Sequence, residues 1–202
     1  MISIIVFPGS NCDRDLKVAI EKNFEIKVNL IWHKTAHLEN SKIIFIPGGF
    51  SFGDHLRAGI LASKSPALQE VIRLSKRGIP IIGICNGFQI LTECNLLPGV
   101  LIKNVNPRFL CKTIRLRVNN KSIFTKLYKQ NQLIDLPIAH AQGNYFATKE
   151  TLDSLEDNDQ IIFRYSSLEQ GSKEEDNPNG SLNNIAGITN LNRTILGMMP
   201  HP

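Results

Sequence analysis

The sequence carries one cysteine in a pattern that favours nucleophilic chemistry. Cys85 lies in Gly83-Ile84-Cys85-Asn86-Gly87, after the apolar run 78–82 and before the helical pattern 88–91. Small residues two positions before and after the cysteine are typical of a sharp strand-to-helix turn, because the strained backbone leaves no room for larger neighbours. Such a turn points the sulfur outward at a helix N-terminus, where the partial positive charge favours the thiolate. The pattern predicts a nucleophile elbow; the alternative is a buried cysteine beside a core strand.

A cysteine nucleophile needs a base that accepts its proton. Among the five histidines, His201 is the best candidate, because it follows the apolar strand pattern 194–198. The flanking Pro200 and Pro202 also restrict its position. The alternative is a surface histidine at a chain end.

The same chemistry needs donors for the negative oxygen of a tetrahedral intermediate. Gly48-Gly49 follows the short apolar run 43–46, and Gly49 can bring a backbone N–H close to a substrate oxygen. The backbone N–H of Asn86, directly after the nucleophile, is the second natural donor. Together they predict an oxyanion hole; the alternative is that Gly48-Gly49 is an ordinary turn.

Other chemistries have weaker support in the residues. His33 and His37 have the i, i+4 spacing of a metal pair on a helix, but they follow a strand pattern with no acidic residue between them, so we expect no metal. The sequence has neither G-x-x-x-x-G-K-[ST] nor G-x-G-x-x-G, and it therefore shows no nucleotide site. Structural roles are expected for the other cysteines, Cys12, Cys94 and Cys111.

The candidate groups must be positioned by regular elements. In the first half, apolar strand patterns alternate with helical patterns, which indicates a mostly parallel sheet with helices on both faces. The predicted strands are 2–7, 25–32, 43–46 and 79–84, and the predicted helices are 13–24 and the segment between Ser65-Pro66 and Gly78. The inward face of the first helix is predicted to carry Leu16, Ala19, Ile20 and Phe24.

Ligand sites in such sheets form at the carboxyl ends of the strands. The turns 8–11 and 47–50 and the cysteine at position 85 all follow strand patterns, so we expect them to converge. After about residue 110 the pattern changes to strands without long helices, which we expect to complete the sheet and to add antiparallel strands. The predicted strands are 113–118, 133–138, 160–165, 185–189 and 194–198. A polar loop is predicted at 172–184, between the third and the fourth of these strands.

Composition excludes several classes of protein. With 202 residues and 42% hydrophobic composition, we expect a single α/β domain spanning 1–202. The net charge of +5 comes from dispersed basic residues, which argues against nucleic-acid binding. No long apolar run, basic leader or C-x-x-C pair is present, so we expect no membrane contact, reduced thiols and a cytoplasmic location.

Six segments, taken in order and with their spacing, resemble one family. They are FPGSNCD at 7–13, PGGFS at 47–51, GD at 53–54 with LRAG at 56–59, GICNGFQ at 83–89, NPNGS at 177–181 and GMMPHP at 197–202. The sequence is thereby similar to the glutaminase subunits of phosphoribosylformylglycinamidine synthase, within the class I glutamine amidotransferases. The resemblance runs from one end of the sequence to the other.

The resemblance implies a flavodoxin-like class I glutamine amidotransferase fold and an activity. Such a subunit hydrolyses glutamine to glutamate and ammonia through a glutamyl thioester on the nucleophilic cysteine. The ammonia passes to a synthetase subunit, which uses ATP and magnesium to convert formylglycinamide ribonucleotide into formylglycinamidine ribonucleotide in purine synthesis. A small bridging subunit is a further implied partner, and no cofactor is implied for the glutaminase subunit itself.

The resemblance also implies roles for individual residues. Cys85 would be the nucleophile, His201 the base, and the backbone amides of Gly49 and Asn86 the oxyanion donors. Residues implied in glutamine binding are Gln89, Phe50, His140, Gly143 and Tyr145. One departure from the family lies between His140 and Gly143, where Gln142 stands in place of the usual glutamate.

A second departure concerns the orienting acid. The family motif continues with a glutamate after the proline that corresponds to Pro202, and the sequence stops there. We therefore expect the 202-residue form to keep the fold but to hydrolyse glutamine poorly. Two alternatives to the glutaminase remain: a catalytically crippled domain that binds the synthetase, and a stand-alone cysteine hydrolase of another amide.

Overall fold

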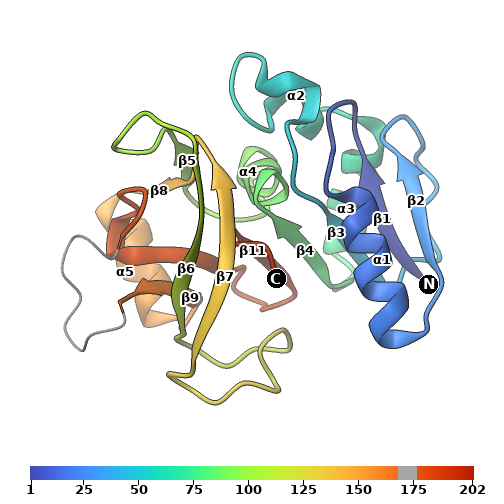
Figure 1. The fold of residues 1–202 in the computed structure, drawn as a ribbon. Coiled ribbons are helices and arrows are strands. Elements are labelled where there is room, and N and C mark those ends of the chain that lie inside the picture. Colours follow the sequence, from blue (N-terminus) through green and yellow to red (C-terminus); the bar gives the residue numbers. More distant parts are fainter. Residues whose placement is uncertain (168–176) are drawn as a thin grey trace. The chain divides into compact units, whose positions relative to one another are not determined.

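The computed structural model describes residues 1–167 and 177–202, which form two compact units, Met1–Leu96 and Leu97–Pro202 (Figure 1). The first unit contains β1 (Ile2–Val6), α1 (Asp13–Phe24), β2 (Val28–Trp32), β3 (Ile43–Ile46), η1 (Ser51–Asp54), α2 (Ile60–Ser63), α3 (Pro66–Ser75), β4 (Ile81–Ile84) and α4 (Asn86–Glu93). The second contains β5 (Val100–Ile102), β6 (Leu110–Val118), β7 (Leu133–His140), β8 (Asn144–Phe146), α5 (Lys149–Asp157), β9 (Ile161–Ser166), η3 (Leu182–Asn184), β10 (Ile185–Thr189) and β11 (Ile195–Met198).

The sheet of the first unit is parallel, in the strand order β2-β1-β3-β4 (Figure 1). Ile4 of β1 lies opposite Leu30 of β2 on one side and Phe45 of β3 on the other. The prediction of alternating strands and helices with parallel pairing is confirmed for this unit. The carboxyl ends of β1, β3 and β4 therefore lie at one edge of this sheet.

Side-chain alternation places helices on both faces of this sheet. Leu16 and Ile20 of α1 pack in one cluster with Phe45 of β3. The next residue of that strand, Ile46, faces the opposite side because successive side chains of a strand alternate, and there it meets Gly87 of α4. Apolar strand residues are thus covered from both sides, as expected for a parallel sheet.

The predicted inward face of α1 is only partly right. Ile20 is buried and Leu16 is half-buried, but Ala19 is exposed and Phe24 is 66% exposed. The helix ends directly after Phe24, where Glu25 adopts a left-handed conformation with φ of 52°. Phe24 is thus the last helical residue, and its i, i+4 spacing from Ile20 does not bring it to the core.

The predicted start of α3 is confirmed. The Ser65 hydroxyl accepts a hydrogen bond from the backbone N–H of Leu68 at 3.4 Å, and Pro66 occupies the first helical turn. This side-chain cap satisfies one of the N–H groups that a helix start leaves without an intrahelical partner. The buried face of α3 consists of Ala67, Leu68, Val71 and Leu74.

The second unit is antiparallel throughout its described strand pairs. Its main sheet has the order β11-β10-β9-β6-β7, and β5 pairs with β8 in a separate two-stranded sheet. The predicted change of pattern after about residue 110 is confirmed. The nine-residue helix α5 was not expected; its start is capped by Thr148, whose hydroxyl accepts from the N–H of Thr151 at 3.3 Å.

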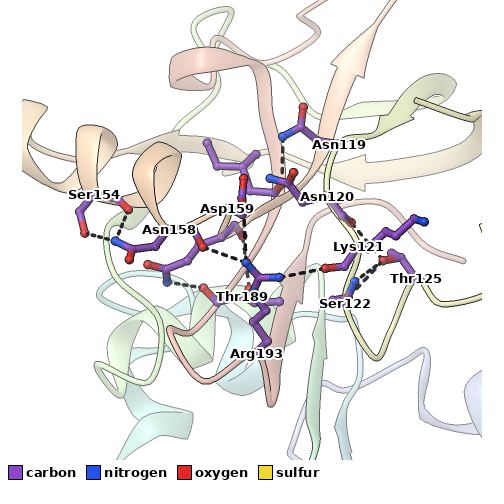
Figure 2. A network of polar contacts seen from close by, with 12 residues as sticks. Asn119, Asn120, Lys121, Ser122, Thr125, Ser154, Asn158, Asp159, Thr189 and Arg193 are labelled. Carbon is purple, nitrogen blue, oxygen red and sulfur yellow. Dashed lines mark hydrogen bonds and ion pairs between the residues drawn. The ribbon is translucent and has the colours of Figure 1, made fainter. Parts of the chain in front are cut away.

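Polar contacts hold the turns at one end of this sheet (Figure 2). The guanidinium of Arg193 donates to the backbone carbonyls of Lys121 and Asn158 at 3.3 and 3.2 Å, and it lies 3.7 Å from the carboxylate of Asp159. Because Arg193 reaches three carbonyl or carboxylate oxygens from two other turns, it links segments far apart in the sequence.

Candidate active site

The turns after β1 and β3 are joined by backbone hydrogen bonds. The N–H of Phe50 donates to the carbonyl oxygen of Gly9 at 2.9 Å, and Ser10 forms an isolated antiparallel bridge with Gly49. These contacts confirm the predicted convergence of two strand ends. They hold the backbone around Gly49 in one conformation.

Gly49 requires the absence of a side chain. Its φ is +141°, a conformation that other residues rarely adopt. A Cβ atom there would lie 2.7 Å from Oδ1 and 2.8 Å from the backbone nitrogen of Asn11. The neighbouring Phe50 is 42% exposed. The conformation of Gly49 agrees with a backbone that is shaped for close approach.

Cys85 has the strained geometry predicted from its neighbours. It lies between β4 and α4 with φ of 51° and ψ of −105°, at the N-cap position of the helix. Gly87 packs so closely that an added Cβ would strike the backbone carbonyl of Ile46. Strain of this kind at a non-glycine residue is maintained only where the surroundings enforce it, and it is typical of functional positions. The predicted strained strand-to-helix turn, hereafter the elbow, is therefore present.

The predicted thiolate is not supported by the surroundings of the sulfur. Burial raises the pKa of Cys85 to about 12, although the backbone N–H of Asn86 lowers it, and the nearby Cys12 and Asp54 add smaller increases. Only 5% of the residue is exposed, so loss of solvation outweighs the helix N-terminus. Burial also raises the pKa of Cys94 to about 12. The pKa thus does not distinguish the two cysteines; the backbone strain at the elbow does.

The side chain of Asn86 connects the elbow with its neighbours. Its Oδ1 accepts from the backbone N–H of Ser51 at 3.1 Å, and its Nδ2 donates to Oε1 of Gln89 at 2.8 Å and to Oδ1 of Asp54 at 3.4 Å. Asn86 and Gln89 are both buried. Gly49, Phe50, Asn86, Gln89 and Cys85, hereafter the elbow group, are therefore brought together within the first unit.

His140 and Gly143, in the second unit, are in direct contact. A Cβ on Gly143 would collide with the imidazole of His140, so this glycine makes room for the ring. Asn104 fixes both residues, since its Nδ2 donates to the carbonyl of His140 at 3.1 Å and its Oδ1 accepts from the N–H of Gly143 at 3.0 Å. Nothing in the sequence pattern indicated Asn104.

The pKa of His140 is lowered to about 4, chiefly by burial and also by the nearby His201, although a backbone hydrogen bond raises it. Burial also lowers the pKa of His201. Both imidazoles are therefore neutral at pH 7, and a neutral imidazole is the form that can accept a proton. His201 is held at its backbone, where its N–H donates to the carbonyl of Pro137 at 2.9 Å.

Tyr145 is fully buried, and its hydroxyl donates to the carbonyl of Pro98 at 2.8 Å. Its backbone N–H donates to the hydroxyl of Ser181 at 2.9 Å. The side chain of Tyr145 therefore supports the fold. His140, Gly143, Tyr145 and His201 form the histidine group of the second unit.

The NPNGS segment supports the histidine group. Oδ1 of Asn177 accepts from the backbone N–H groups of Asn179, Gly180 and Ser181. This arrangement presents Nδ2 of Asn179, which donates to the carbonyl of Gly143 at 2.8 Å and to the hydroxyl of Tyr165 at 3.1 Å. Part of the predicted loop 172–184 lies outside the described residues, but this part of it has a defined role.

The histidine pair considered for a metal is not arranged as one. His33 is buried, its ring stacks on Phe7 with centroids 5.9 Å apart, and it meets Trp32 edge-on at 4.6 Å. His37 is exposed and lies outside any helix, so the i, i+4 spacing does not place the two on one face. Within residues 1–167 and 177–202, no three His, Cys, Asp or Glu side chains are grouped as metal ligands.

A strained cysteine elbow follows a strand of a parallel sheet whose neighbouring strand ends in a glycine turn. Comparison of the sequence with known protein families identifies the class of protein. Residues 1–202 match the CobB/CobQ-like glutamine amidotransferase domain. The chain belongs to this family of glutamine amidotransferases.

Curated relatives carry one particular name. The chain is 48% identical over 202 residues to "Phosphoribosylformylglycinamidine synthase subunit PurQ" of Chlorobium luteolum, covering 100% of the chain and 87% of that protein. It is 50% identical over 200 residues to the subunit of the same name from Synechocystis sp., covering 98% of the chain and 89% of that protein. The resemblance found in the six sequence segments is confirmed.

Solved structures agree with these relatives. PurLQS from Thermotoga maritima matches with a TM-score of 0.86 and 36% identity, covering 100% of this chain and 86% of that one. The expected class I glutamine amidotransferase fold is confirmed. No helix in the described part of the chain is long and apolar enough to cross a membrane.

Proposed function

We propose that this chain is the glutaminase subunit of a phosphoribosylformylglycinamidine synthase. It hydrolyses the side-chain amide of glutamine to glutamate and ammonia, and a synthetase subunit uses the ammonia in purine synthesis. The strained elbow of Cys85 carries this proposal, because a φ of 51° at a non-glycine residue holds this cysteine at the start of α4, and the adjacent Asn86 bonds to Ser51 in the turn after β3. The family match and the curated relatives support the same activity.

In the proposed reaction, the sulfur of Cys85 attacks the amide carbon of glutamine while His201 accepts the thiol proton. This general base is needed because burial keeps the thiol protonated at neutral pH. The backbone N–H groups of Gly49 and Asn86 stabilise the negative oxygen of the tetrahedral intermediate. The C–N bond then breaks, and the proton held by His201 leaves with the nitrogen as ammonia.

Water completes the cycle. His201 takes a proton from a water molecule, which attacks the thioester carbon and releases glutamate, and the proton returns to the sulfur of Cys85. The residues proposed to bind the glutamine are Gln89, Phe50, His140, Gly143 and Tyr145. No cofactor is required for these steps in this subunit.

The proposed partner is the synthetase subunit, which uses ATP and magnesium, with a small bridging subunit between the two. Support comes from the solved PurLQS structure, which matches over 100% of this chain. We also propose a cytoplasmic location. It fits the four cysteines, all in the described residues, among which no disulfide forms.

The test is covalent labelling with a glutamine-mimicking diazoketone, located by peptide mass spectrometry. We expect the added mass on Cys85 alone, and excess glutamine should prevent it. Cys94→Ser is the matched control, since Cys94 is also a thiol whose pKa burial raises to about 12. Labelling should persist in that variant and disappear in Cys85→Ser. A folded chain without glutamine-sensitive labelling would contradict the glutaminase and favour a domain that only binds the synthetase.

A further inference from the structure

The side-chain amide of Asn86 has three polar partners, and together they determine its orientation. Oδ1 faces the backbone N–H of Ser51, which is only a donor. Nδ2 faces two oxygens, Oε1 of Gln89 and Oδ1 of Asp54. Exchanging the oxygen and nitrogen of Asn86 would place a donor against a donor and an acceptor against two acceptors. The orientation shown is therefore the stable one.

This orientation in turn determines the orientation of Gln89. Because Nδ2 of Asn86 can only donate, the group of Gln89 that lies 2.8 Å away must be its oxygen. The Nε2 amide group, the donor end of Gln89, is consequently turned away from Asn86. A residue one helical turn beyond the nucleophile thus has a defined donor end and a defined acceptor end.

Asp54 is an unusual member of this network. It is partly buried and has a left-handed backbone with φ of 53°. Burial raises the pKa of its carboxyl group, and within residues 1–167 and 177–202 it forms no salt bridge. A carboxylate without a cation in such surroundings costs free energy of solvation. The contact it retains, at 3.4 Å, is with the side chain of Asn86.

We propose, as an extension of the proposed function, that the Asn86 side chain, held by Asp54, is a positioning group for substrate selection. It turns the Nε2 amide of Gln89 toward the bound glutamine. Gln89 then offers N–H donors, which suit the carboxylate or carbonyl oxygens of glutamine and do not suit its α-ammonium group. The side chain of Asn86 itself need not touch the substrate, and this role is separate from that of its backbone N–H.

Charge exchange between the two residues tests this role. Asn86→Asp can still accept from Ser51, but its second oxygen faces the oxygens of Gln89 and Asp54. Gln89 must then rotate and present its oxygen to the substrate. In the double variant Asp54→Asn/Asn86→Asp, the amide at position 54 can donate to the carboxylate at position 86. The pair is restored, whereas Gln89 still faces a carboxylate and stays rotated.

The measurement is protection of Cys85 from iodoacetamide by glutamine, together with the denaturant midpoint of unfolding. Iodoacetamide lacks the α-ammonium and α-carboxylate groups of glutamine and modifies thiols generally, so the half-protecting glutamine concentration reports substrate binding. We expect Asn86→Asp to raise it tenfold or more, as expected when one hydrogen bond to a charged group is lost. The double variant should recover the midpoint but not the protection. Asp153→Asn, at an exposed aspartate of α5, is the control and should change neither.

Each other outcome has a defined meaning. Recovery of protection together with stability in the double variant, or unchanged protection in Asn86→Asp, would overturn the positioning role and leave the glutaminase intact. If Asn86→Asp does not fold, the double variant decides alone, and wild-type protection in it would overturn the role. If glutamine fails to protect the wild-type chain, the proposed function itself is wrong, and this inference with it.

Discussion

The side-chain nitrogen of Asn179 donates to the carbonyl oxygen of Gly143 at 2.8 Å, across a sequence separation of 36 residues. Gly143 also gives space to the ring of His140, so the position of this imidazole depends on the loop that carries Asn179. The NPNGS segment is therefore a support for the histidine group.

Asn179→Ala should destabilise the chain by about 3 kcal/mol. The substitution removes two buried hydrogen bonds from the amide nitrogen, to the Gly143 carbonyl and the Tyr165 hydroxyl, and two to the amide oxygen, from the backbone N–H and hydroxyl of Ser181; each contributes about 1 kcal/mol net. Denaturant unfolding followed by circular dichroism measures the change. Asn158→Ala, at an exposed asparagine that bonds to Ser154, is the control and should cost less than about 1 kcal/mol.

Stability should fall on acidification because of His140. The pKa of His140 is about 4 in the folded chain against an ordinary value of 6.5. As the pH falls, the unfolded state therefore binds a proton at a higher pH than the folded state does. The stabilisation is present above pH 6.5 and is lost as the pH falls toward 4, by about 3 kcal/mol in total. His201, whose pKa burial also lowers, acts in the same direction.

Unfolding free energies at pH 7.5, 5.5 and 4.5 compare the wild type with His140→Gln. The variant should show the smaller pH dependence, whatever its stability at pH 7.5. His55→Gln, at an exposed histidine, should keep the wild-type slope. Equal slopes in His140→Gln and the wild type would refute the assignment of the acid sensitivity to His140.

Gly87→Ala should cost about 3 kcal/mol and disturb the elbow, because the added methyl group meets the carbonyl of Ile46 and overpacking is expensive. Gly78→Ala provides the comparison. Gly78 has φ of +76° with no heavy atom within 4 Å of the added Cβ. That variant should therefore lose only about 1 kcal/mol of stability, the cost of a left-handed backbone conformation at alanine. Thermal unfolding of both variants measures the difference, and equal losses would show that steric contact at α4 is unimportant.

Alkylation of Cys85 by iodoacetamide should accelerate with pH without reaching a plateau below pH 9.5. A thiol with a pKa of about 12 is protonated throughout that range, and its thiolate fraction grows tenfold for each pH unit. Rates are obtained from quantitative peptide mass spectrometry, with the exposed Cys111 as the internal reference for reagent activity. A plateau near neutral pH would show that the thiolate is stabilised in the resting chain.

Local requirements of the backbone could be predicted from the sequence. The small residues around Cys85 indicated its strained turn, and the serine and proline at 65–66 indicated the start of α3, because both depend on residues next to each other in the chain. Alternating strand and helix patterns likewise indicated the parallel sheet of the first unit. The family, too, follows from six short segments in order.

Contacts between distant residues could not be predicted in this way. The strand-to-helix pattern at Cys85 favoured a thiolate, yet burial by the surrounding fold raises the pKa of the thiol to about 12. Likewise, no local pattern showed that Asn86 would join Ser51 and Asp54, or that Phe24 would be exposed.

The sequence alone thus determined which groups are available for chemistry, since residue type and neighbouring backbone specify an elbow, a glycine turn and a capped helix. Only the tertiary structure decided the protonation state of Cys85 and the orientation of Gln89. The physical reason is that solvation and hydrogen-bond partners are properties of the space around a side chain, and that space is filled by residues far away in the sequence.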